Sequence, residues 1–267
     1  MKYVINILRE QIQYLKLIFK MAKYDNKSKY QMHYLGVLWQ FIMPIIQVGI
    51  YWFIFGVGIR SREPVGDVPF LVWLIAGLIP WFFIGPTITQ ASNSVYAKIN
   101  LVSKMKFPVS VLPTITIVSN AFNFFVMLVI AQIVMMINGI YPTVQTIQLI
   151  YYIFASFALV YALSLLFSTL STIARDFQNM LQSTIRLLFF LTPILWDPSR
   201  LSDLYHNILK LNPIYYLIIG YRNSFLSEGW IFEDITYSIY FWSFVLLVLL
   251  LGSYMHMKFR NKFIDYI

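Results

Sequence analysis

The residues most able to do chemistry are one charged side chain and several aromatic rings, because they lie in long apolar stretches. Arg186 is the only Lys, Arg, Asp or Glu in the apolar stretch 180–196. A charged group inside a membrane is costly and by default marks a functional site. Arg186 would suit an anionic substrate. It also lies only a turn or two from the start of its stretch, so it could instead snorkel to the membrane surface.

Aromatic residues make up 18% of the chain. Most are expected in the core and in belts at the membrane interfaces. Rings can also hold sugars by stacking against their apolar faces, so rings inside the apolar stretches could line a path for a glycan. The residues predicted to line a substrate path are Trp39, Tyr51, Trp52, Phe55, Trp81, Phe82 and Arg186.

Catalytic and metal-binding patterns are missing from the sequence. There is no cysteine, and His33, His206 and His256 are too far apart for metal-ligand spacing. None of the 11 glycines is followed by Lys, so the chain has no phosphate-binding loop. We therefore expect no metal, no cofactor and no enzymatic activity in this chain, and any energy must come from another subunit.

The elements that carry these residues are predicted to be membrane helices. Hydrophobic residues make up 59% and charged residues 12% of the chain, against about 45–50% and 25% in soluble domains. The sequence predicts an all-α polytopic membrane protein, because lipid cannot satisfy open backbone groups. Six transmembrane helices are expected at 35–58, 70–89, 109–137, 147–174, 180–196 and 235–257.

Orientation follows from the distribution of basic residues. Fifteen of the 20 Lys and Arg residues fall on the side of the membrane that carries both termini. The positive-inside rule then places both termini in the cytoplasm. We read the net charge of +9 as membrane topology and not as a nucleic-acid surface.

The segment 1–34 precedes the six-span domain 35–258, and 259–267 forms a cytoplasmic tail. In the first segment an apolar stripe recurs at three- and four-residue steps, made of Ile5, Leu8, Ile12, Leu15, Phe19 and Ala22. This pattern predicts an amphipathic interfacial helix on the anionic inner leaflet. It could be an anchor only, or a docking platform for a cytoplasmic partner.

The region between the last two predicted spans is apolar but too short to cross the membrane. A short amphipathic pattern covers 201–211, and an apolar stretch covers 213–225. We expect external re-entrant helices here, packed against protein. The alternative is a plain external loop.

Several short motifs along the chain are typical of one transporter family. They are 34–39 (YLGVLW), 51–61 (YWFIFGVGIRS), 102–108 (VSKMKFP), 139–142 (GIYP), 175–176 (RD), 193–196 (PILW) and 212–216 (NPIYY). On these motifs the chain resembles the membrane permeases of polysaccharide-exporting ATP-binding cassette transporters, most closely the wall teichoic acid translocation permeases of Gram-positive bacteria.

The resemblance implies a homodimer of six-span subunits joined to two ATPase subunits that bind ATP and Mg²⁺. The substrate would be a lipid-linked anionic glycopolymer, wall teichoic acid on undecaprenyl diphosphate, moved across the plasma membrane. Arg175 and Asp176 would be structural residues on the cytoplasmic side. The runner-up is a permease for O-antigen-type polysaccharide, or an exporter of small molecules or lipids.

A non-transporting enzyme or scaffold acting on lipid-linked glycans is a further alternative. It is disfavoured because Asp176 is the only acidic residue between Asp67 and Asp197.

The stretch 92–107 is predicted to pass motion from the ATPase into two spans. It is bounded by Phe107-Pro108, because proline disfavours helix at the residue before it. Its lysines could alternatively do no more than follow the positive-inside rule. The residues predicted to couple to the ATPase are Lys20, Lys23, Asn100, Ser103, Lys104, Lys106, Phe107 and Pro108.

Overall fold

The computed structural model describes residues 1–30, 34–59, 63–98 and 107–266. Within these residues the chain is helical and contains no named strand, only an isolated bridge between Val65 and Val68. The all-α prediction is confirmed. The long apolar runs form helices because each helix satisfies its own backbone hydrogen bonds, as a bilayer requires.

Five helical segments among the described residues are long and apolar enough to cross a membrane. The first is α3 (Trp39–Tyr51), which continues as the π-helix η2 (Trp52–Ile59). The others are α4 (Phe70–Ser92), α7 (Val111–Ile137), α8 (Gln148–Ile173) with the short η3 (Val144–Ile147) before it, and α12 (Ile235–Phe259). They correspond to five of the six predicted spans.

The sixth predicted span, 180–196, corresponds to α9 (Arg175–Leu191). The helix lies about five residues earlier than predicted, and it is amphipathic rather than uniformly apolar. It ends at Leu191 because Pro193 follows: proline restricts the residue before it to an extended conformation, and Thr192 has ψ 137°.

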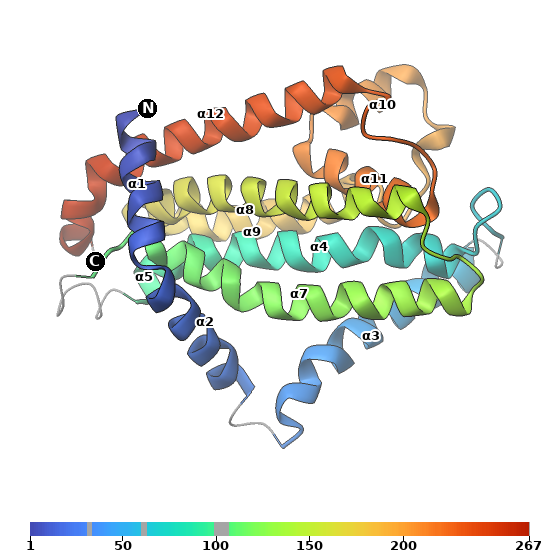
Figure 1. The fold of residues 1–267 in the computed structure, drawn as a ribbon, viewed down its shortest axis with the longest axis horizontal. Helices are drawn as coiled ribbons and strands as arrows, with labels where there is room; N and C mark the ends of the chain where they lie inside the picture. Colours follow the sequence, from blue (N-terminus) through green and yellow to red (C-terminus); the bar gives the residue numbers. More distant parts are fainter. Residues whose placement is uncertain (31–33, 60–62, 99–106, 267) are drawn as a thin grey trace.

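The bundle is built around α4 (Figure 1). This helix packs against α7, α8, α9 and α11, and α12 packs on α8. In an apolar stretch of 18 residues within α4, 83% of the residues are buried in the single chain. The corresponding share is 6% for the segment formed by α3 and η2. In Figure 1, α3 splays away from the bundle, so its outward surface is left for lipid or a partner.

The close packing of α12 on α8 depends on a glycine. A Cβ at Gly252 would lie 3.0 Å from the backbone nitrogen of Leu166 on α8. Small residues at such crossings let two membrane helices approach closely.

The predicted short helices before the last span are confirmed. The chain leaves α9 through the single turn η4 (Pro198–Arg200) and then forms α10 (Asp203–Lys210) and α11 (Pro213–Leu226). Helix α11 packs between α4 and α8 and has most of its residues buried. Both helices lie at the end of the bundle opposite the two termini (Figure 1).

The N-terminal segment forms two helices, α1 (Lys2–Gln13) and α2 (Leu15–Tyr30), where a single amphipathic helix was predicted. Helix α1 packs on α12 and α2 packs on α7. These contacts bury Ile7, Ile18 and Ala22, while the predicted apolar stripe, except for Ala22, is exposed. The stripe therefore faces away from the bundle, as contact with a lipid surface requires.

The chain after α4 continues as the short α5 (Ser94–Ala97), and after α12 it continues as η5 (Arg260–Tyr266). Both lie at the same end as the termini (Figure 1).

Candidate functional site

Two adjoining cavities lie beneath α3 on one face of α4. The larger, about 730 Å³, lies between α3, α4 and α7. The second, about 570 Å³, lies between α3, α4 and α9. They share Gln47, Phe82, Pro86 and Gln90, so we describe them together as the α4 groove.

The larger cavity combines carboxamides with aromatic rings. Its amide side chains are Gln40, Gln47, Gln90, Asn120 and Asn123. Asn120 donates to Thr87 Oγ1 at 3.1 Å and to Gln90 Oε1 at 3.2 Å, which ties α7 to α4. The rings are those of Trp39, Phe82, Phe83 and Phe124. Such a wall offers stacking surfaces together with hydrogen-bond donors and acceptors.

Prolines also line this cavity. Pro44 lies within α3 and Pro86 within α4, and both contribute to the wall.

The second cavity is aromatic and has one cation at its edge. Tyr51 and Trp81 both pack against Phe189, with ring centroids 5.2 and 5.5 Å apart. Arg186 is exposed, and its guanidinium donates to the Gln182 carbonyl and to Ser183 Oγ, both at 3.3 Å. Among the described residues it takes part in none of the three ion pairs. Its charge therefore stays free for an anionic group.

Five of the seven predicted substrate-path residues line the α4 groove. Trp39 lines the larger cavity, Phe82 lines both, and Tyr51, Trp81 and Arg186 line the second. Trp52 and Phe55 lie outside the lining of both cavities and pack against the hydrophobic core. The structure thus brings together most of the residues chosen from the sequence, and their role in transport stays a prediction.

The end of the bundle that holds the two termini carries the described part of the predicted coupling set. Asn100, Ser103, Lys104 and Lys106 lie outside the described residues. Lys20 and Lys23 are exposed on α2. Phe107 and Pro108 line a cavity of about 540 Å³ together with Glu10, Tyr14 and Arg260.

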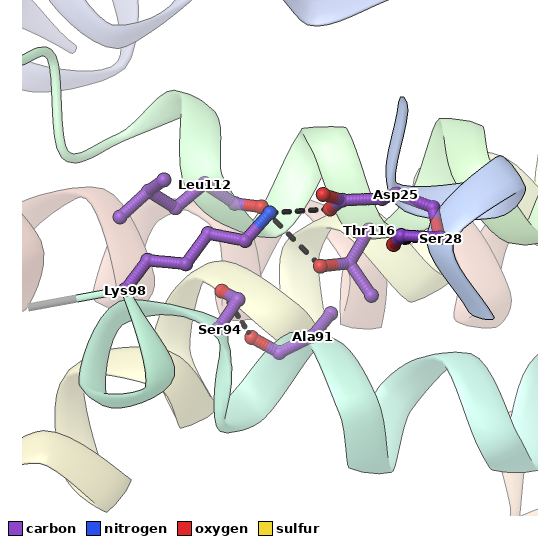
Figure 2. Close-up of polar contacts among 7 residues, drawn as sticks. All are labelled: Asp25, Ser28, Ala91, Ser94, Lys98, Leu112 and Thr116. Carbon is purple, nitrogen blue, oxygen red and sulfur yellow. Dashed lines mark hydrogen bonds and ion pairs between the residues drawn. The ribbon is translucent and has the colours of Figure 1, made fainter. Parts of the chain in front are cut away.

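Polar contacts tie the N-terminal helices to this end of the bundle. Lys98, at the end of α5, forms an ion pair with Asp25 of α2 (Figure 2). Thr114 of α7 donates to Gln11 Oε1 of α1 at 2.8 Å. Arg260 pairs with Glu10 at 2.8 Å, which joins α1 to the segment after α12. Through these contacts, a displacement of α1 or α2 would also move α5, α7 and the C-terminal segment.

Arg175 and Asp176 begin α9 at this end. The Arg175 guanidinium lies 3.2 Å from the Tyr96 ring centroid and donates to Asn93 Oδ1 at 3.3 Å. Asp176 lies in the first turn of the helix, where a negative charge is favourable. This arrangement holds the start of α9 against α5.

Sequence reasoning missed a deeply buried cation. Arg222 on α11 is 2% exposed, and it donates to the carbonyls of Pro193 at 2.6 Å and Ile194 at 2.9 Å. Its guanidinium lies 3.5 Å from the Trp73 ring centroid. Arg222 therefore fastens the turn after α9 to α11 and α4. The sequence predicts an external re-entrant segment over 213–225, and hydropathy alone does not place Arg222 in the core.

Residues 16–226 match the family model described as ABC-2 type transporter. The chain belongs to this family. Its members are membrane subunits of transporters and are not themselves the catalytic subunit.

The chain is similar to several relatives named O-antigen export system permease protein RfbA. The protein of Myxococcus xanthus is 28% identical over 227 residues, which is 84% of this chain and 86% of the relative. A protein of Klebsiella pneumoniae is 27% identical over 245 residues, which is 91% of this chain and 93% of the relative. The similarity therefore extends over nearly the full length of the relatives.

Proposed function

We propose that this chain is the permease of an ATP-driven exporter that moves a lipid-linked polysaccharide across the plasma membrane. The observation that carries the proposal is the α4 groove, where aromatic rings and carboxamides meet inside a membrane bundle. Rings stack on the apolar faces of sugars, while carboxamides both donate to and accept from hydroxyl groups. The export of O-antigen named for the relatives supports the same substrate class.

The exporter would contain two copies of this chain and two ATPase subunits that bind ATP and Mg²⁺. A second copy is supported by α9, which exposes Asn179, Gln182, Ser183 and Arg186 in the single chain. Polar side chains facing lipid are costly. A second copy that encloses an aqueous path along α9 would remove this cost.

The charge of the polymer separates two candidate substrates. The relatives favour an O-antigen-type polysaccharide. A wall teichoic acid, rich in phosphate, is favoured by the unpaired Arg186 in the second cavity, because guanidinium groups bind phosphate well.

Reconstitution tests the proposal. The chain and its ATPase are placed in vesicles with the ATPase outward, and lipid-linked polymer is added to the outer leaflet. We expect ATP-dependent protection of the polymer from added glycan- or phosphodiester-cleaving enzymes. Phe82→Ala in the groove should reduce protection, and Phe232→Ala, a matched change on an exposed ring, should not.

Active ATP hydrolysis without protection of any lipid-linked polysaccharide would refute the proposal. The two substrates are separated by supplying an uncharged O-polysaccharide and a polyol-phosphate polymer in parallel.

Cysteine labelling tests the proposed orientation. The chain has no cysteine, so single cysteines can be introduced at Ser199 and at the C-terminus. With both termini in the cytoplasm, an impermeant reagent should label Ser199→Cys in intact cells and leave the C-terminal cysteine unlabelled. The reverse pattern would contradict the orientation.

A further inference from the structure

A fourth cavity, separate from the α4 groove, lies at the end of the bundle opposite the termini. We call it the outer pocket. It has a volume of about 370 Å³ and is enclosed by α10, α11, the 228–234 segment and the start of α12. It shares no lining residue with the groove. Its size falls in the range of small-molecule sites.

The lining of the outer pocket combines aromatic rings with hydrogen-bonding groups. Trp230, Tyr215 and Tyr237 provide ring surfaces, and Trp230 is 39% exposed, so the pocket is open at its rim. Asp197, Glu233 and Asp234 provide carboxylates. A sugar presents an apolar face of C–H groups and an edge of hydroxyls, which match rings and carboxylates respectively.

The polar side chains of the pocket are held in place by the protein. Glu233 Oε1 accepts from the Trp230 backbone N–H at 2.9 Å. Asp234 Oδ1 accepts from the Tyr237 backbone N–H at 3.0 Å and caps α12. The Tyr215 hydroxyl contacts His206 Nε2 at 3.2 Å. Fixed groups of this kind lose little conformational freedom when a ligand binds.

The charge of the pocket selects among saccharides. The lining carries three carboxylates and one cation, Lys210, whose ammonium pairs with Asp234 at 3.3 Å. The buried Arg222 guanidinium behind the lining interacts electrostatically with Asp197. The balance is negative, so phosphate or uronate groups would be repelled, whereas neutral hydroxyl groups can donate to the carboxylates.

From this geometry we propose that the outer pocket binds an uncharged sugar residue of the polymer as it leaves the permease. The part of the proposal that concerns the exported polymer rests on the proposed function. The binding of uncharged saccharide does not, because it requires neither ATPase nor transport. The pocket would hold emerging sugar units and so oppose their return into the bundle.

Binding is tested on the purified chain in lipid nanodiscs without the ATPase. The probes are the uncharged disaccharides chitobiose, maltose and mannobiose, followed by saturation-transfer difference NMR. We expect at least one to bind with a dissociation constant in the millimolar range. Trp230→Ala removes a stacking surface, and Glu233→Gln removes the charge of a hydrogen-bond acceptor, so each should weaken binding by about tenfold or more.

The variants are chosen to separate the pocket from other parts of the chain. Glu233→Gln keeps an oxygen that can accept from the Trp230 backbone, so it removes the charge with little effect on the loop. Phe232→Ala is the matched control, because Phe232 lies between the two pocket residues in the sequence but is outside the lining. Phe82→Ala tests binding in the groove.

Absence of binding by all three disaccharides would overturn the proposal. So would binding that Phe82→Ala removes and both pocket variants leave unchanged. If Trp230→Ala does not fold, Glu233→Gln decides alone. Export that fails in reconstituted vesicles, with saccharide binding intact, would refute the proposed function and leave the pocket assignment standing.

Discussion

Replacement of Gly77 by alanine should destabilise the protein through Arg222. A Cβ at position 77 would lie 2.6 Å from Arg222 Nη2 and 3.1 Å from Cζ. Real Cβ atoms essentially never come closer than 3.0 Å, so the guanidinium must move. Moving the guanidinium would lengthen or break its hydrogen bonds to the carbonyls of Pro193 and Ile194.

The magnitude follows from what the guanidinium loses. Hydrogen bonds to charged groups contribute about 1.5–3 kcal/mol each, so losing both would cost roughly 3–6 kcal/mol. If the head group shifts and keeps one of the two, the cost resembles that of overpacking, about 1–3 kcal/mol. We therefore expect Gly77→Ala to lower the free energy of unfolding by about 3 kcal/mol.

Unfolding in detergent micelles or nanodiscs measures this loss, and a second background identifies its cause. Methionine at position 222 has no guanidinium, so Gly77→Ala should cost little in an Arg222→Met background. Gly49→Ala is the matched control, because a Cβ there meets nothing within 4 Å. It should be neutral or stabilising by up to about 1 kcal/mol, since alanine favours helix over glycine. An equal cost of Gly77→Ala in both backgrounds would refute the reasoning.

Three further predictions concern other contacts. Asp25→Lys should place two cations together where Asp25 pairs with Lys98, and so reduce export. The double variant Asp25→Lys/Lys98→Asp should restore part of the export. No recovery in the double variant would show that export does not depend on this ion pair. Gly252→Leu should lower stability by about 1–3 kcal/mol, because its side chain meets the backbone of Leu166; a thermal midpoint equal to wild type would contradict the close crossing of α8 and α12. Arg186→Lys should keep part of the transport and Arg186→Leu should lose it, since lysine keeps the charge without the planar guanidinium. Normal export by the leucine variant would show that Arg186 only snorkels to the membrane surface.

Hydropathy located the membrane helices but could not say which of them is central. The segment formed by α3 and η2 is as apolar as α4, yet one lies at the edge of the bundle and the other in its middle. A lipid tail and a neighbouring helix are equally apolar surroundings, so the sequence pattern is the same in both cases. The position of each helix is decided by side-chain packing.

The bounds of α9 were wrong by about five residues for a similar reason. The prediction followed the apolar stretch 180–196, whereas the helix begins at Arg175 and ends at Leu191. The polar first turn was read as a connection, because a polar helical face is not distinguished from a loop by apolar content. Pro193 was the signal that could have placed the end correctly.

The groove was anticipated in part, and the outer pocket was not. Tyr51, Trp81, Phe82 and Arg186 can each be predicted singly, because an aromatic or charged group stands out in an apolar stretch of sequence. The outer pocket is assembled from α10, α11 and the start of α12, and its residues are ordinary in an external segment. Only the folded chain brings them together.

The two prolines in the larger cavity have a consequence for how a polymer could slide along it. Proline has no backbone N–H, so Pro44 and Pro86 cannot supply the helical hydrogen bond to the carbonyls of Gln40 and Phe82, four residues earlier. Both of those residues also line the cavity. The carbonyls of these two residues therefore lack their helical donor, whatever side chains surround them. Under the proposed function, a hydroxyl-rich chain that reached these oxygens could donate to them with little preference for any particular sugar.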